Sequence, residues 1–142
     1  MSAEGRLVIR QVAKPSKYTA DEFVNWFCKV FNLSESRSSV EPKMLRIIAS
    51  RSLSGEGVTS KELNKILSMP RSTAIYHLNR FINSGIAVRK GRKYYLRSES
   101  MEDTIEELQD DMLREFSKLM ELAEKFDRIM EGESYGRGKK PK

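Results

Sequence analysis

The chain has 142 residues, with 26 Lys and Arg, 20 Asp and Glu and a formal net charge of +6 at pH 7. This length suits one compact domain with an appendage, or two very small domains. The single cysteine, Cys28, excludes an intrachain disulfide, and with the single histidine, His77, it leaves too few ligands for an ordinary zinc site. We therefore expect no metal and no cofactor.

The charge is divided unevenly along the sequence. Residues 41–98 contain 12 Lys and Arg against 3 Asp and Glu, whereas residues 99–133 contain 4 against 13. A general need for a soluble surface would not separate the two signs in this way. The basic segment therefore favours a polyanionic partner.

Residues 1–18 are interpreted as an N-terminal arm. Leu7, Val8, Ile9 and Val12 favour a short edge strand, and disorder is the alternative. The first twenty residues lack the apolar run of a signal peptide, and no stretch approaches the roughly 20 apolar residues that span a bilayer. We expect a soluble, cytoplasmic protein that associates with the nucleoid and not with a membrane.

The first predicted helix begins at Thr19, because Thr19-x-x-Glu22 is a capping box. Aromatic and apolar side chains then recur on one helical face, up to Phe31. This stripe packs on the core of its own domain, meets a second subunit, or does both with its two flanks. On the second interpretation, Phe23, Trp26 and Phe27 belong to a dimer interface. A further helix is predicted from Ser39 or Val40 to the turn at residues 55–57, with Met44, Leu45 and Ile48 buried.

Residues 59–96 have the order helix, tight turn, helix and basic hairpin. The capping box Thr59-x-x-Glu62 starts the first helix, whose expected apolar face consists of Leu63, Ile66 and Leu67. A second helix follows Pro70 and is ended by Gly85; its expected inward side chains are Ala74, Leu78 and Phe81. Apolar residues from 86 to 96 then predict two short strands around residues 90–92. This order is that of a winged helix-turn-helix, and residues 19–98 would form the DNA-binding domain.

The outward positions of the helix at residues 70–84 are candidates for DNA contact in the major groove. Arg71 suits guanine edges or a phosphate, and an exposed Ile75 suits thymine methyl groups. The complete set is Arg71, Ser72, Thr73, Ile75, Tyr76, Asn79 and Arg80. In the hairpin, four cations surround Gly91, namely Arg89, Lys90, Arg92 and Lys93. They favour a clamp on the phosphate backbone or the minor groove, although such a run of charge is often only a solvated surface.

His77 flanks the buried stripe of the same helix. We interpret it as a histidine at the rim of the core, hydrogen-bonded within the fold. A pH-sensing or ligand-binding role is the alternative, but no second residue supports it.

Residues 99–131 predict a long dimerisation helix that begins at the cap Ser100-x-x-Asp103. Seven of eight heptad core positions are apolar, which is typical of a coiled coil. The exception is Glu115, which has apolar Phe116 beside it. The interface residues assigned here are Ile105, Leu108, Met112, Phe116, Leu119, Leu122, Phe126 and Ile129. Gly132 is expected to end the helix, and residues 132–142 to form a disordered basic tail that either attracts phosphates or only improves solubility.

Residues 62–96 resemble the winged-helix core of ArsR-type transcription regulators and of the related MarR, PadR and TrmB types. The segments ELxxxL, RSTxxxHL, SGI and GRxYYL carry the resemblance, and the short hairpin is similar to that of archaeal members. The resemblance implies a homodimer that reads promoters and is held by helices flanking the winged helix, here 19–31 and 102–130. Two features depart from it: the metal-sensing ligands are lacking, and Pro70 replaces the usual capping Ser or Thr.

We therefore expect a homodimeric transcription regulator that binds specific sequences of double-stranded DNA. Two alternatives remain: a chromatin-like architectural DNA-binding protein of low specificity, and a winged-helix adaptor that binds other proteins. An enzyme is not expected, because the sequence has no glycine-rich phosphate loop and no nucleophile with a matching base. The sequence does not identify an effector, a target site or the sign of regulation.

Overall fold

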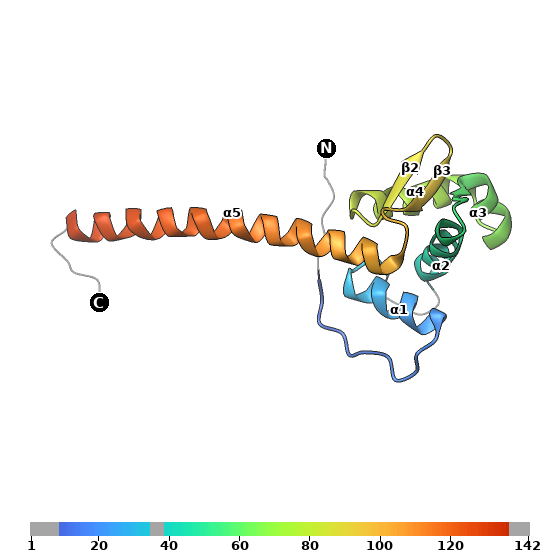
Figure 1. Ribbon diagram of the computed structural model, residues 1–142, viewed down its shortest axis with the longest axis horizontal. Coiled ribbons are helices and arrows are strands. Elements are labelled where there is room, and N and C mark those ends of the chain that lie inside the picture. The colour runs from blue at the N-terminus through green and yellow to red at the C-terminus, as the bar shows by residue number, and fades with distance from the viewer. Residues whose placement is uncertain (1–8, 35–38, 137–142) are drawn as a thin grey trace. The chain divides into compact units, whose positions relative to one another are not determined.

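The structure is a computed structural model that describes residues 9–34 and 39–136. These residues form five α-helices and three short strands, in the order α1 (Ala20–Val30), α2 (Val40–Leu53), β1 (Val58–Thr59), α3 (Ser60–Leu67), α4 (Arg71–Asn83), β2 (Ala87–Lys90), β3 (Lys93–Leu96) and α5 (Met101–Gly136) (Figure 1). The chain divides into two units, residues 1–105 and 106–142, so the boundary lies inside α5. The expectation of a mainly helical chain with a small β-hairpin is confirmed.

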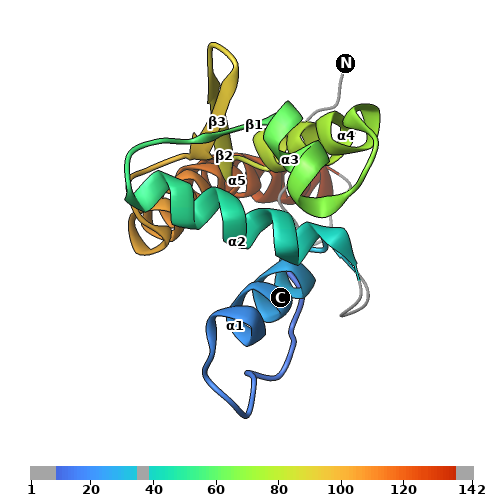
Figure 2. The ribbon, with the colours of Figure 1, turned by 90° about the vertical axis from the view of Figure 1, so that its right-hand side faces the viewer.

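The first unit has one core shared by its helices and its sheet. α1 packs on α2, α2 contacts β3, and α3 packs on α4 (Figure 2). The largest fully buried side chains come from every one of these layers: Phe27 of α1, Met44, Leu45 and Ile48 of α2, Leu63 of α3, Leu78 and Phe81 of α4, and Ile86 before β2. The inward positions predicted for α2 and α4 are confirmed. In α3, Ile66 is 51% exposed, because the buried face of this short helix is centred on Ser60 and Leu63 instead.

The hairpin belongs to an antiparallel sheet of three strands, in the order β1-β3-β2. Ala87 pairs with Leu96 and Lys90 with Lys93, so the hairpin closes through Gly91 and Arg92. Gly91 has a φ of +64°, which suits the first central position of a two-residue hairpin turn. The predicted hairpin is confirmed, but β1 was not predicted, and it pairs Val58 with Tyr94 and Thr59 with Lys93.

Local side-chain and backbone bonds set the ends of the helices. The capping box of α3 is present: the Thr59 hydroxyl accepts from the Glu62 N–H, and Glu62 accepts from the Thr59 N–H at 2.9 Å. The latter bond, first among its causes, lowers the pKa of Glu62. At the end of α4, Gly85 has a φ of +82° and the Ile86 N–H donates to the Phe81 carbonyl at 3.0 Å. A residue with this left-handed backbone conformation often ends a helix, and glycine adopts it most readily.

The N-terminal arm forms no strand in the described part, residues 9–18, so the edge strand expected to include Ile9 and Val12 is wrong there. Leu7 and Val8 lie outside the described residues. The Arg10 N–H donates to the Val30 carbonyl at 2.7 Å, and the Trp26 Nε1–H donates to the Val12 carbonyl at 3.1 Å. The arm therefore lies against α1 by isolated hydrogen bonds, which require no strand partner.

The ends of α5 differ in how well they were predicted. Its start is confirmed, because the Ser100 hydroxyl accepts from the Asp103 N–H at 3.0 Å. Its end is not: the helix passes through Gly132 to Gly136, since a lone glycine costs only about 1 kcal/mol in a helix interior. Residues 132–136 are thus helical, and the rest of the expected tail lies outside the described residues. Among the helices described, none has the length and apolar character needed to cross a membrane.

Candidate nucleic-acid interface

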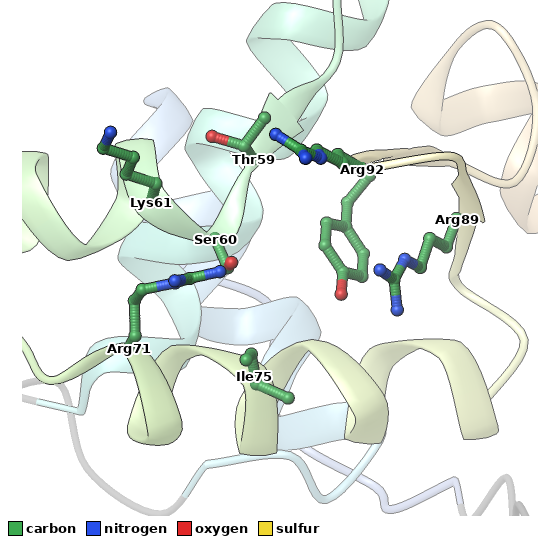
Figure 3. Close-up of a pocket in the computed structure, with 8 residues that line it drawn as sticks. Thr59, Ser60, Lys61, Arg71, Ile75, Arg89 and Arg92 are labelled. Carbon is green, nitrogen blue, oxygen red and sulfur yellow. The ribbon is translucent and has the colours of Figure 1, made fainter.

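A basic cleft of about 480 Å³ lies in the first unit, between the starts of α3 and α4 and the β2–β3 hairpin. Its lining comprises Thr59, Ser60, Lys61, Arg71, Ile75, Arg89, Arg92 and Tyr94. Figure 3 shows Arg71 reaching from α4 toward Ser60, with Arg89 and Arg92 directed into the same space from the hairpin. Four of these eight side chains are basic and none is acidic. A concave surface with one sign of charge attracts anions of the opposite sign.

The hairpin directs its cations by the alternation of side chains along a strand. Arg89 faces the cleft, where its guanidinium lies 5.5 Å from the centre of the Tyr94 ring and its Nε–H donates to the Gly91 carbonyl at 2.8 Å. Lys90 lies over a different ring, with Nζ 5.3 Å from the centre of Tyr95. These contacts hold Arg89 in place before any ligand arrives, which lowers the entropic cost of binding.

α4 presents one exposed face beside the cleft. Its other face is anchored by Ala74, Leu78 and Phe81, all at most 1% exposed. Ser72, Ile75, Tyr76 and Asn79 are exposed, so an external surface can contact these four side chains without disturbing the core. Pro70 makes no side-chain hydrogen bond to the first turn of α4, so no side-chain cap occupies the amides that start this helix.

The sequence did not predict that Lys61 and its neighbours Thr59 and Ser60 belong to this site. They reach the cleft because Thr59 pairs with Lys93 across β1 and β3, which places the start of α3 against the hairpin. β1 has only two residues, too few to show the alternation that predicts a strand. Tyr94 is buried and also lines the cleft.

The predicted DNA contacts do not all lie together. Arg71, Ile75, Arg89 and Arg92 line the cleft, and Ser72, Tyr76 and Asn79 lie on the exposed face of α4. Lys90 and Lys93 are exposed on the hairpin but outside the lining, and Thr73 is half-buried.

Arg80, another predicted DNA contact, has its guanidinium engaged within the fold. It lies 3.3 Å from a Glu41 carboxylate oxygen and donates to the Asn32 carbonyl at 3.4 Å. The same Glu41 oxygen lies 3.0 Å from Nδ1 of His77, although the orientation is not that of a hydrogen bond. His77 is half-buried, as expected for a histidine at the rim of the core, but its Nδ1 makes no hydrogen bond within the fold. Arg80 therefore joins α4 to α2.

Cys28 is fully buried on the inner side of α1. Burial first, and the Glu41 carboxylate second, raise the pKa of its thiol to about 12. A thiol is nucleophilic only as its thiolate, so Cys28 is unreactive at neutral pH. This position excludes the intersubunit disulfide that a cysteine on an exposed face would permit.

The predicted dimer contacts separate into three groups by their exposure. Phe27 is 1% and Leu108 is 3% exposed, so neither has surface left for a second subunit. Phe23, Trp26 and Met112 are half-buried. The other predicted positions on α5 are exposed, namely Ile105, Phe116, Leu119, Leu122, Phe126 and Ile129.

Within the described part of the chain, no group of three or more His, Cys, Asp and Glu side chains is arranged to hold a metal ion. Comparison of the chain with protein-family models, curated proteins and solved structures gave no significant match. The geometry of the cleft and of the exposed helical faces is therefore the basis for inferring a function.

Proposed function

We propose that this chain is a winged helix-turn-helix regulator that binds specific double-stranded DNA as a homodimer. The observation that carries the proposal is that Lys61, Arg71, Arg89 and Arg92 all line one cleft beside an exposed helix. Phosphate oxygens are the anions that such a set of cations recognises in nucleic acids. In this proposal, α3 and α4 form the helix-turn-helix, and the hairpin is the wing.

In the proposed complex, α4 lies in the major groove, which is wide enough to admit a helix. Ser72, Ile75 and Asn79 would face base edges, since all three are exposed on one side of α4. Tyr76 lies on the same side and would reach the backbone. The cleft would hold the DNA backbone where it passes between α4 and the wing. Contacts to base edges confer sequence specificity. Contacts to the backbone fix the position of the protein on the DNA and dominate affinity.

The homodimer is supported by the exposed apolar side chains of α5. Phe116, Leu119 and Phe126 are 56%, 60% and 59% exposed, which is unusual for so many large apolar groups on one helix. A second copy of the same helix would bury them. Paired reading units would then favour a target with two related half-sites.

The salt dependence of DNA binding tests the role of the cleft. The wild-type chain should bind a random-sequence duplex with an affinity that falls steeply as salt rises, because bound cations displace counterions. The double variant Arg89→Gln/Arg92→Gln should lower the slope of log affinity against log salt by about 2, at roughly 0.9 per lost phosphate contact. Fluorescence anisotropy at several salt concentrations measures this slope.

The matched control is Lys118→Gln/Lys125→Gln, which removes the same charge from α5. These lysines contact Glu115 and Glu121 of their own helix at 3.0 and 4.0 Å, and neither lines the cleft. An equal decrease of the slope in the two double variants would show that only net charge matters and would overturn the site.

Selection from a random duplex pool then distinguishes the regulator, which enriches a defined site, from an architectural protein, which enriches none.

A further inference from the structure

Two hydroxyl-bearing residues line the basic cleft in addition to its cations. Ser60, the first residue of α3, is 8% exposed, and Tyr94 of β3 is 3% exposed. Both nevertheless line the cleft, so the small accessible part of each side chain is at the cleft. The fold therefore holds both side chains in place before any ligand arrives.

Neither hydroxyl has a hydrogen-bond partner within the part of the chain that the structure describes. The side-chain polar atoms that are completely buried there without a partner are Ser34 Oγ, His77 Nδ1 and Ser98 Oγ. The hydroxyls of Ser60 and Tyr94 are not among them, so both can be reached from the cleft. A hydroxyl that is largely covered by the fold and donates to nothing lacks a favourable interaction. An acceptor in the cleft would supply it.

The lining of the cleft determines which kind of acceptor fits. Its charged groups are one ammonium and three guanidinium groups, which can only donate hydrogen bonds. The nonbridging oxygens of a phosphate diester only accept, so the two sets are complementary. Ile75, which is 37% exposed, adds an apolar wall to the same cleft. This wall suits the sugar that adjoins a phosphate in a nucleic acid better than a free phosphate ion.

We propose that the hydroxyls of Ser60 and Tyr94 donate to the DNA phosphate oxygens that the cleft holds, an inference that rests on the proposed function. Tyr94 is the partner of Arg89 in the sheet, and its ring lies 5.5 Å from the Arg89 guanidinium. The ring positions one donor, and the hydroxyl is a second donor. Ser60 approaches from the start of α3, where Arg71 reaches toward it (Figure 3). The phosphate is thus bound from both sides of the cleft.

Neutral donors contribute to DNA binding in a different way from cations. A cation that binds a phosphate releases counterions and therefore steepens the dependence of affinity on salt. A hydroxyl gains a hydrogen bond and releases no counterion. Loss of one hydroxyl should therefore lower the affinity at every salt concentration and leave the salt slope unchanged. For a hydrogen bond to a charged acceptor, the expected loss is about 10-fold or more.

Tyr94→Phe tests this contribution, because it removes only the hydroxyl and keeps the ring beside Arg89. Tyr94→Phe and Ser60→Ala should each bind a random-sequence duplex about 10-fold more weakly in fluorescence anisotropy, with the salt slope of the wild type. The matched controls are Tyr95→Phe, at the next position of β3, and Ser50→Ala, at an exposed position of α2. Neither residue lines the cleft, so both controls should bind as the wild type does. Circular dichroism checks that each variant is folded.

The outcomes separate this inference from the proposed function. Wild-type affinity in both Tyr94→Phe and Ser60→Ala would overturn the role of the hydroxyls, while the proposed function would stand. A smaller salt slope in Tyr94→Phe would show that Tyr94 acts only through the arginines, and would also overturn it. A wild-type chain that binds no duplex even at low salt would overturn the inference and the proposed function together.

A last measurement distinguishes a backbone phosphate from a free anion. Inorganic phosphate is exchanged for chloride at constant ionic strength during DNA binding. The wild type should still bind the duplex, because the DNA backbone is the ligand of the hydroxyls. If phosphate abolishes DNA binding by the wild type but not by Tyr94→Phe, the hydroxyls take a free anion, and the inference is overturned.

Discussion

At the scale of single residues, Glu41 holds together the most unusual group in the core. It is 9% exposed and is shared by His77 and Arg80 of α4 at 3.0 and 3.3 Å. A buried carboxylate is costly unless it is paired. The cluster therefore ties α2 to the helix that we propose reads DNA. The residue pattern indicated that His77 lies at the rim of the core, but nothing in it indicated Glu41 as the partner, because the two are 36 positions apart.

The stability of the fold should depend on the protonation of His77. Burial lowers the pKa of its imidazole from 6.5, the Glu41 carboxylate partly opposes this, and Arg80 lowers it further. Because the folded pKa lies below the unfolded one, the stability associated with neutral His77 is fully present above about pH 6.5. It is lost as the pH falls through the folded pKa. The free energy of unfolding in urea should thus decline between about pH 7.5 and pH 5.5.

The variant His77→Gln should reduce that decline, because glutamine does not titrate. Glu62, whose pKa is lowered from 4.5, contributes only below this interval and does not interfere. An unchanged pH dependence in the variant would exclude His77 as its source.

At the scale of elements, the helices with a clear apolar period were predicted well and the short strand was not. α4 and α2 reveal their inward faces because side chains recur every three or four residues. β1 exists because its two residues pair with β3, a strand more than thirty positions later in the chain. That pairing brings Lys61 to the lining of the cleft, so a residue of the proposed site was missed for the same reason as the strand.

The turn before β1 offers a test of this local packing. Gly57 has a φ of +72°, and a Cβ there would lie 2.7 Å from the Tyr95 ring. Gly55 has a φ of +80°, but a Cβ there would meet no atom within 4 Å. Gly55→Ala should lower the free energy of unfolding by about 1 kcal/mol, because alanine is strained in this left-handed backbone conformation. Gly57→Ala should cost about 1–3 kcal/mol more, because the Tyr95 ring must move. Urea unfolding of both variants measures the difference, and equal costs would contradict the close contact.

At the scale of the whole molecule, α5 is the element whose apolar surface the single chain leaves most exposed. Its heptad pattern predicted a long helix and an interface. Leu108 and Phe27, however, are buried in a single copy, whereas the apolar positions from 116 onward are exposed. A pattern of apolar residues shows that a face seeks burial, but not which partner covers each position.

Charge placed on the exposed face of α5 should separate the proposed dimer. Leu119→Asp removes an apolar group worth about 2 kcal/mol in each copy and adds a charge. The two copies together lose about 4 kcal/mol, so the dimer should dissociate at concentrations roughly 1,000-fold higher. Ser117→Asp adds the same charge on the opposite side of the helix and should leave the dimer intact. Sedimentation of both variants checks this, and equal behaviour would show that α5 is not the interface.

The sequence by itself determined the order of the helices, their caps at Thr19, Thr59 and Ser100, the hairpin turn at Gly91 and the separation of basic from acidic segments. These features depend on residues within a few positions of one another, so local propensity and periodicity suffice. Only the tertiary structure decided that Lys61 lines the same cleft as Arg71, Arg89 and Arg92. It also decided that Arg80 contacts Glu41 and that Cys28 is buried in the core. Each of these depends on contacts between distant parts of the chain, which the side chains permit but do not encode locally.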